Sequence, residues 1–464
     1  MVELTRRAFI GSAVGATAMA SVGCASLSNE AAVAVPEGRP LPKPSPQQFE
    51  WQDMELGMFF HFDIPVYKPG WNWRSWEGLP SPDMYNPSKL DTDQWMEAAK
   101  AFGAKYAVFV AKHCSGFCQW QTDVYPYGVK QSSWRNGKGD VVRDFVEACH
   151  KYGIKPGIYA SVTANAFLEV DNPGLVNRGQ AADPEKQARY ARVCEQMLTE
   201  LWSRYGDLFE IWFDGGALPV EKGGPDMVPL LEKYQPDAIV FQGPAASIRW
   251  VGNERGRAPY PCWATVPDKA DYYGPGDPEG ARWLPAECDV PVRDHDWFWE
   301  PNREDRLYSL DDLMDMYYKS VGRNGNLLLN ANPAPDGLVP EPDFRRYVEF
   351  GAEIRRRFEK PVAATRGESE VVELRLSPPQ KIDHVVIMEE IAHGERIRHY
   401  EVEGLGPGNK WAKLCSGISV GHKRIQHFDP IEVSMVRLRI TECVARPLIR
   451  NLAVYSVGSV AEGT

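Results

Sequence analysis

The sequence predicts a β/α barrel over residues 50–358 followed by an all-β sandwich over residues 359–464. In the first region, short apolar runs alternate with amphipathic helical stretches, which is typical of a parallel sheet covered by helices. In the second, strand-like runs are separated by turn residues, and no predicted helix interrupts them. The number and length of the strand–helix units favour a barrel over an open doubly wound sheet. No Gly-x-Gly-x-x-Gly follows the first apolar run, which argues against a dinucleotide-binding fold.

Each element of the barrel is predicted from its hydrophobic period. Continuous apolar runs predict strands at residues 56–62, 106–110, 154–161, 208–213, 238–241 and 326–329. Apolar residues at helical spacing predict helices at residues 92–102, 140–152, 184–205, 228–234 and 310–321. Segments rich in proline and glycine, from residue 243 to residue 299, obscure the sixth to eighth units.

The C-terminal sandwich is predicted from short strand-like runs with turn signals between them. These runs cover residues 371–376, 384–388, 400–402, 424–428 and 434–440. The region has no cluster of carboxylates. We therefore expect it to pack against the barrel or to bind sugar, and not to supply catalytic groups.

Composition excludes several classes of protein. Of the 464 residues, 43% are hydrophobic and 25% are charged, which is ordinary for a globular protein and excludes a disordered chain, a collagen and a coiled coil. The net charge is −11 and no basic stripe stands out, so we expect no nucleic-acid partner. No run after the N-terminal region resembles a transmembrane helix.

The N-terminal region is predicted to contain an export signal followed by an extended tether. Arg6 and Arg7 precede an uncharged stretch rich in Ala, Gly and Ser, which is typical of a twin-arginine export signal over residues 1–24. Small residues before Cys24 resemble a lipoprotein cleavage site; because Ser21 stands where Leu is usual, ordinary signal cleavage is the alternative. Residues 25–49 are proline-rich and predict an extended tether. We expect an exported bacterial protein, periplasmic or a cell-surface lipoprotein, with Cys24 as its lipid anchor to the membrane.

The chemistry of a β/α barrel lies at the carboxyl ends of its strands. Polar residues that end the predicted strands are therefore the site candidates, namely His61, Asp63, His113, Tyr159, Asp214 and Gln242. Asp214 is the strongest, because it follows an apolar strand and precedes two glycines that would let a ligand approach closely. A helix cap or a loop salt bridge is the structural alternative for Asp214, and a core histidine is the alternative for His61 and His113.

A glycosidase would need a second carboxyl group. Glu254 and Glu287 are the candidates, since each lies beside aromatic and turn residues. Either could instead pair with a nearby arginine, Arg249 or Arg293. The histidines could in principle bind a metal with Asp214, but neither His-x-His nor His-Glu-x-x-His is present, and the cysteines show no zinc-ligand spacing. We therefore expect no metal.

Six motifs in order resemble the α-L-fucosidases of glycoside hydrolase family 29. They are GMFFHF (57–62), GAKY (103–106), KHxxGF (112–117), IWFDG (211–215), WVGNE (250–254) and SVGRNGNLLLN (320–330). The likeness spans about residues 50 to 360, and the sandwich resembles the discoidin-type domain of many members. The resemblance implies a retaining exo-glycosidase without a cofactor, acting on terminal α-linked L-fucose of oligosaccharides or glycans.

The resemblance also implies roles for individual residues. Asp214 matches the nucleophile, and the Gly-Asn-Glu stretch is similar to the branch that acts on α-1,3/1,4-fucosides, where the Glu is the acid/base. This points to Glu254, with Glu287 as the fallback. By the resemblance, His61 and His113 match sugar-hydroxyl ligands and Trp76 matches a wall of the pocket. We also expect Cys114, Tyr159, Trp250 and Trp297 to bind the substrate.

Three residues depart from the family pattern. Cys114 and Ser115 stand where the family usually has His-Asp, and Asp63 stands where Gly is common. A thiol cannot replace an imidazole as a strong hydrogen-bond donor. Two alternatives follow: an α-L-galactosidase-like glycosidase acting on a related L-sugar, and a non-catalytic carbohydrate-binding protein on the same barrel.

Overall fold

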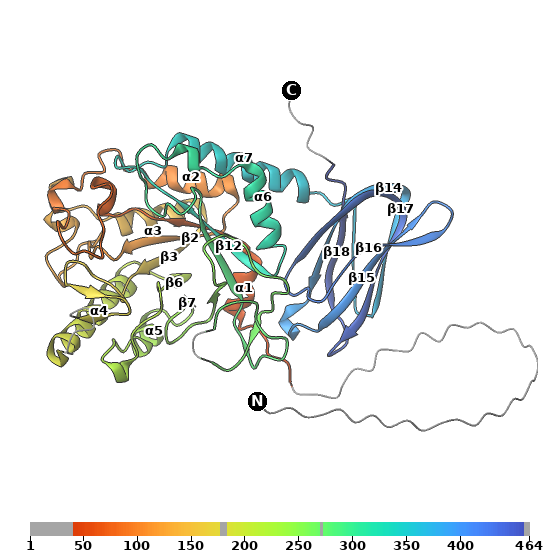
Figure 1. Cartoon of the computed structure of the whole chain (residues 1–464), viewed down its shortest axis with the longest axis horizontal. Coiled ribbons are helices and arrows are strands. Elements are labelled where there is room, and N and C mark those ends of the chain that lie inside the picture. Colours follow the sequence, from red (N-terminus) through yellow and green to blue (C-terminus); the bar gives the residue numbers. More distant parts are fainter. Residues whose placement is uncertain (1–39, 177–182, 270–271, 459–464) are drawn as a thin grey trace, which may run out of the picture. The chain divides into compact units, whose positions relative to one another are not determined.

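The computed structural model describes residues 40–176, 183–269 and 272–458 (Figure 1). The predicted export signal, with Arg6, Arg7 and Cys24, lies outside the described residues. Within the described ranges, no helix combines the length and the apolar character that a membrane span needs.

The predicted barrel is confirmed. Eight parallel strands form one sheet in the order β7-β6-β3-β2-β1-β12-β11-β8. A parallel bridge between Phe241 and Ile248 brings the two edges of this sheet together, so the barrel is nearly closed. The strands are β1 (Leu56–Phe60), β2 (Tyr106–Lys112), β3 (Lys155–Ala160), β6 (Glu210–Trp212), β7 (Ile239–Phe241), β8 (Arg249–Trp250), β11 (Ala286–Pro291) and β12 (Gly325–Ala331).

Helices follow most of the strands, as their amphipathic patterns predict. They are α2 (Thr92–Phe102), α3 (Val141–Tyr152), α4 (Pro184–Arg204), α5 (Val228–Tyr234), α6 (Leu310–Lys319) and α7 (Glu341–Phe358). The bounds of α2 can be predicted from the sequence because both of its ends are capped. The Asp91 side chain caps the first turn, and Gly103 takes the left-handed conformation at the C-terminus.

A further helix, α1 (Pro46–Met54), precedes the first strand and begins before the predicted tether ends at residue 49. Ser45 and Gln48 form a reciprocal capping box, and Pro46 occupies the first helical position, so the local sequence favours a helix start here. Trp51 on α1 is fully buried, and its indole N–H donates to Glu210 at the start of β6 over 3.1 Å. The end of the predicted tether is therefore part of the fold.

The region that the sequence left obscure contains β8 and β11 with no helix between them in the described residues. A short hairpin of β9 (Thr265–Val266) and β10 (Arg282–Trp283) takes the place of a covering helix. Strand β11 escaped prediction because Glu287 and Asp289, both buried, interrupt its apolar pattern. Strand β8 has only two residues, too few for any period.

The C-terminal all-β domain is confirmed. Its strands are β13 (Ala363–Gly367), β14 (Val371–Glu389), β15 (Ile397–Gly406), β16 (Lys410–Gly417), β17 (Arg424–Cys443) and β18 (Ile449–Tyr455). They form one antiparallel sheet rather than two separate sheets, because the long strands β14 and β17 continue through shifts in register and join its two halves. The first half of β14 pairs with β17 alone, and its last residues also pair with β18.

Glu55, between α1 and β1, joins the barrel to the β domain. Its carboxylate contacts the ammonium group of Lys423 and lies 3.0 Å from Nε2 of His422, both in the segment before β17. Burial alone would raise the pKa of Glu55, but Lys423 and His422 lower it to about 2. The ionised carboxylate thus stabilises the attachment of the β domain at neutral pH.

We expect Glu55→Gln to lower the free energy of unfolding by roughly 1–3 kcal/mol, because Lys423 would remain largely buried without its counter-charge. Since the pKa of Glu55 is depressed, the difference from wild type should be present at pH 7 and shrink as the pH falls from about 4.5 towards 2. Urea unfolding at several pH values measures this. Glu341→Gln, which removes the exposed partner of Arg345, is the control and should change little.

Candidate active site

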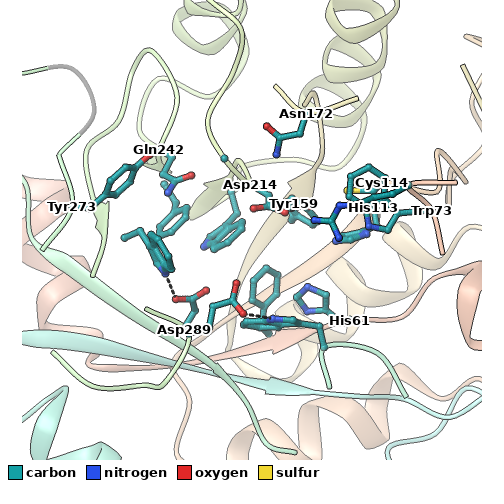
Figure 2. A pocket seen from close by; sticks show the side chains of 18 residues that line it. His61, Trp73, His113, Cys114, Tyr159, Asn172, Asp214, Gln242, Tyr273 and Asp289 are labelled. Carbon is teal, nitrogen blue, oxygen red and sulfur yellow. Dashed lines mark hydrogen bonds between the residues drawn. The ribbon is translucent and has the colours of Figure 1, made fainter. Parts of the chain in front are cut away.

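A cavity of about 390 Å³ opens at the carboxyl ends of the barrel strands (Figure 2). Aromatic rings form much of its wall, and carboxyl, imidazole and amide groups converge on it. The lining residues are Phe59, His61, Trp73, Arg74, His113, Cys114, Tyr159, Asn172, Trp212, Asp214, Gly215, Phe241, Gln242, Trp250, Glu254, Tyr273, Asp289 and Trp297. Aromatic walls with a few convergent polar groups suit a small ligand with apolar faces and several hydroxyl groups.

Asp214 lies near the centre of this cavity, beside Tyr159 (Figure 2). It follows β6 by two residues, and Gly215 and Gly216 after it take positive φ angles of 68° and 76°. The Tyr159 hydroxyl donates a hydrogen bond to the Asp214 carboxylate over 3.2 Å, and the Thr163 hydroxyl donates to its backbone carbonyl over 3.0 Å. These contacts fix the carboxylate towards the cavity.

Opposing effects set the pKa of Asp214. Burial raises this pKa above its ordinary value, the Tyr159 hydrogen bond lowers it, and the charge of Glu254 raises it. The Tyr159 hydroxyl stabilises the ionised carboxylate, and so does the positive charge of Arg74. A half-buried carboxylate held in this way faces the cavity and is suited to act as a nucleophile.

Glu254 lies on the exposed loop after β8 and lines the same cavity. The indole N–H of Trp297 donates to its carboxylate over 2.9 Å. Asp214, Glu254 and Asp289 all line this cavity, and the charge of Glu254 raises the pKa values of the other two. Asp214 and Glu254, the two predicted catalytic carboxyl groups, therefore face a common space.

Burial disfavours the charged form of both histidines that line the cavity. His61 Nδ1 lies 2.7 Å from the side-chain oxygen of Asn330, and burial lowers the pKa of His61 to about 3. Burial also holds the pKa of His113 well below its usual range. A neutral imidazole offers one donor and one acceptor, which matches the hydrogen-bonding capacity of a sugar hydroxyl.

Glu287, the fallback acid, does not line the cavity. It is fully buried below the cavity wall, where its carboxyl group accepts hydrogen bonds from the Tyr106 hydroxyl at 2.7 Å and the Trp212 indole N–H at 2.9 Å. It also contacts Glu210, whose Oε1 has no hydrogen-bond donor. Two carboxyl groups in contact need a proton between them, and burial raises both pKa values, that of Glu287 to about 7.

This acid pair predicts a pH dependence of stability. Because the folded pair holds a proton that the unfolded chain would release near pH 4.5, its contribution is complete below that pH and is lost as the pH rises through about 7. Glu287→Gln supplies the bridging N–H without a titrating proton. We therefore expect the unfolding free energy of the variant to fall less steeply than that of wild type between pH 5 and 7, by up to about 1.4 kcal/mol per pH unit. Parallel curves would show that the pair does not share a proton; Glu341→Gln is again the control.

Of the predicted substrate-binding residues, only Trp76 is missing from the cavity wall. Trp73 and Arg74, from the same loop, line the cavity instead. The Trp76 backbone takes a φ of 62°, unusual for a bulky residue, and no sequence signal announces that turn. The other predicted residues line the cavity, namely His61, His113, Cys114, Tyr159, Trp250 and Trp297.

Sequence reasoning missed Asp289, Asn172 and Tyr273 as lining residues. Asp289 lies on β11, and its carboxylate accepts a hydrogen bond from the Trp250 indole N–H over 2.7 Å. Burial raises the pKa of Asp289 well above its usual range. The sequence feature that could have identified Asp289 is an acidic residue within a mostly apolar run. Asn172 and Tyr273 lie in insertions between barrel strands, where neither residue type nor spacing marks them.

Asp63, a predicted rim residue, is buried outside the cavity wall. Its carboxyl group accepts hydrogen bonds from the Ser115 hydroxyl at 2.6 Å and from the Ile64 backbone N–H at 2.7 Å. Burial raises the pKa of Asp63 to about 7. Two of the residues that depart from the family pattern, Asp63 and Ser115, thus contact each other and fasten the turn that carries His113 and Cys114.

Among the described residues, one group of side chains could hold a metal ion. The ligand atoms of His113, Cys114 and Asp214 all lie within 4.8 Å of one another. His113 and Cys114 follow β2, and Asp214 follows β6.

Known proteins resemble this chain along most of its length. The family "Alpha-L-fucosidase" matches residues 37–356. Alpha-L-fucosidase 1 of Arabidopsis thaliana is 30% identical over 92% of this chain and 90% of its own length. A crystal structure of a putative alpha-L-fucosidase from Bacteroides thetaiotaomicron is 43% identical, with a TM-score of 0.85 over 90% of this chain and all of that one.

A glycoside hydrolase 29 family member from a rumen bacterium aligns with a TM-score of 0.79 at 29% identity, over 91% of this chain and 79% of that one. These likenesses cover the barrel and the β domain together. The cavity, with its pair of carboxyl groups at the strand ends, lies within the region that the family match covers. The chain therefore belongs to the α-L-fucosidase family of glycoside hydrolases.

Proposed function

We propose that this enzyme is a retaining exo-α-L-fucosidase in which Asp214 is the nucleophile and Glu254 the acid/base. The convergence of these two carboxyl groups on one cavity, between neutral histidines and aromatic walls, carries the proposal. A Ruminococcus gnavus family 29 fucosidase of the same fold has been solved in complex with fucose. The substrate class is a terminal α-linked L-fucoside of an oligosaccharide or glycan.

The first step breaks the glycosidic bond. Asp214 attacks the anomeric carbon and forms a glycosyl ester while Glu254 donates its proton to the leaving oxygen. Trp297 holds the Glu254 carboxyl group in place, and Tyr159 holds that of Asp214. The indole and phenol groups therefore orient the two carboxyl groups within the cavity that receives the glycoside.

The second step hydrolyses the ester. Glu254, now ionised, takes a proton from water, which attacks the anomeric carbon and frees Asp214. Because Glu254 lies on an exposed loop, water reaches it from the cavity mouth. The two inversions give net retention of configuration, which proton NMR of the first-formed sugar anomer measures directly. An inverted first product would contradict the proposal.

Turnover of an aryl α-L-fucoside tests the substrate, with the aryl α-L-galactoside assayed beside it. The two sugars differ at C6, where fucose has a methyl group and galactose a hydroxymethyl group. Higher kcat/KM on the galactoside would support the α-L-galactosidase alternative, which the thiol of Cys114 in the cavity wall favours. Sugar binding without turnover on either compound would support the binding-protein alternative.

We expect Cys114→His to change the ratio of kcat/KM for these two sugars by roughly tenfold or more in favour of the fucoside. The imidazole has a larger volume than the thiol, so it should leave less room in the cavity wall for the additional hydroxyl group that galactose carries on C6. Cys118→Ala, four residues further on and outside the cavity wall, is the control. An unchanged ratio would mean that residue 114 does not contact the sugar.

We further propose export through the twin-arginine route, with a lipid anchor on Cys24, to the periplasm or cell surface. Arg6 and Arg7 before a weakly apolar stretch, and small residues before Cys24, support this. Cell fractionation after replacing both arginines by lysine tests the route. Unchanged export of that variant would contradict the twin-arginine route. A Cys24→Ala protein that stays in the membrane fraction would contradict lipidation.

A further inference from the structure

His113, Cys114 and Asp214 bring three different metal-binding groups to one side of the cavity. Their ligand atoms lie within 4.8 Å of one another. In Figure 2, His113 and Cys114 lie close together on the side of Asp214 away from Gln242 and Tyr273. Adjacent residues after one strand and a carboxylate after another form this cluster, so the barrel framework fixes its spacing.

This donor set matches Zn²⁺. An imidazole nitrogen, a thiolate sulfur and a carboxylate oxygen are the three ligand types that zinc takes in proteins, and three protein ligands leave a fourth position for water. In a tetrahedral zinc site the ligand atoms are about 3.5 Å apart, so small side-chain rotations of roughly 1 Å would close the present spacing. The cavity supplies room for the ion and its water.

The protonation states also suit binding of a dication. Burial disfavours the charged form of His113, so a ring nitrogen can offer a lone pair. Burial and the neighbouring charge of Asp214 raise the pKa of the Cys114 thiol to about 12. Zinc would neutralise that negative charge and replace the thiol proton: Cys–SH and Zn²⁺ give Cys–S–Zn⁺ and one H⁺.

We propose that His113, Cys114 and Asp214 bind Zn²⁺ and that the ion and the glycoside exclude each other from the cavity. Such an ion would be an inhibitor and not a cofactor, because it would occupy the carboxylate that has to attack the anomeric carbon. The inhibition, but not the binding, rests on the proposed role of Asp214.

Direct binding tests the site without an activity assay. The untagged full-length protein is titrated with Co²⁺, whose bond to a thiolate gives an ultraviolet charge-transfer band, and Zn²⁺ is then added to displace it. We expect one equivalent of Co²⁺ to give the band in wild type and in the controls Cys415→Ser and Cys24→Ala, and no band in Cys114→Ser or Cys114→Ala. Circular dichroism checks that the variants are folded. A band that persists without Cys114, or no band in wild type, would overturn the site.

Kinetics test the exclusion. Zn²⁺ should inhibit hydrolysis of an aryl α-L-fucoside competitively, EDTA should restore the rate, and Cys114→Ser should raise the inhibition constant by at least about tenfold. Equal inhibition of wild type and Cys114→Ser would refute the exclusion. If the protein binds cobalt through Cys114 but hydrolyses no α-L-glycoside, the metal site is supported and the proposed function is contradicted. The failure of one proposal can therefore be distinguished from the failure of the other.

Discussion

Asp214→Asn should lower kcat by a factor of about 10⁴ or more while leaving the fold intact. An amide cannot form the glycosyl ester, so the first step has no nucleophile. The amide has nearly the volume of the carboxylate and can still accept the hydrogen bond from Tyr159, so the cavity wall should keep its shape. Steady-state kinetics on an aryl α-L-fucoside and a thermal unfolding curve measure the two effects.

Covalent labelling identifies the nucleophile independently. A fluorinated fucosyl inhibitor that traps the ester should attach to the peptide containing Asp214, and mass spectrometry reads the site. Asp289→Asn is the matched control, since Asp289 lines the same cavity and is held by Trp250. Wild-type label on Asp289 or Glu254 would refute the assignment of Asp214.

The second large effect is expected for Glu254→Ala. Without its acid, the enzyme should lose about 10²–10⁴-fold in kcat/KM on substrates with poor leaving groups and least on activated aryl fucosides, whose departure needs no proton. On the activated aryl fucosides, which still form the glycosyl ester, azide should then restore turnover, because it attacks the ester without base assistance. The product should be a fucosyl azide of retained configuration. The exposed position of Glu254 leaves room for this small anion.

Two other carboxyl groups provide the comparison. Glu287→Ala should show no azide rescue, since Glu287 is enclosed by Tyr106 and Trp212 away from the cavity. Asp289→Ala tests the remaining lining carboxyl group, whose raised pKa would suit a proton donor. If azide rescues Asp289→Ala and not Glu254→Ala, the acid/base is Asp289.

The parts of the fold that could be predicted are those where local sequence and tertiary structure agree. Helix α2 was predicted to the residue, because an Asp cap and a terminal Gly bound a clear amphipathic pattern. Strand β11 could not be predicted, because it contains two buried acidic residues, Glu287 and Asp289. These residues interrupt the continuous apolar run by which a barrel strand is recognised. Only partners distant in sequence, such as Tyr106 and Trp212, make that burial tolerable.

The same limit applies to the site. The ends of the barrel strands can be predicted from the sequence, and active-site residues lie at these ends. This rule correctly predicted four residues of the cavity wall, namely His61, His113, Tyr159 and Asp214. Loop residues that line the cavity are harder to predict from the sequence, because tertiary contacts decide how a long connection folds. In the loop that carries Trp73 and Trp76, the backbone turn selects one indole for the wall, and neither composition nor spacing distinguishes the two.

The contact between Asp63 and Ser115 implies that the effects of substitutions at these two positions are not independent. Restoring the usual Asp at 115 alone would place two carboxyl groups in contact in a buried place, and restoring Gly at 63 alone would leave the Ser115 hydroxyl without its acceptor. Each single replacement should thus cost more free energy of unfolding than the double replacement. The conformation of the turn that carries Cys114 therefore depends on residues 63 and 115 as a pair, and the effect of changing one can be judged only with the other in view.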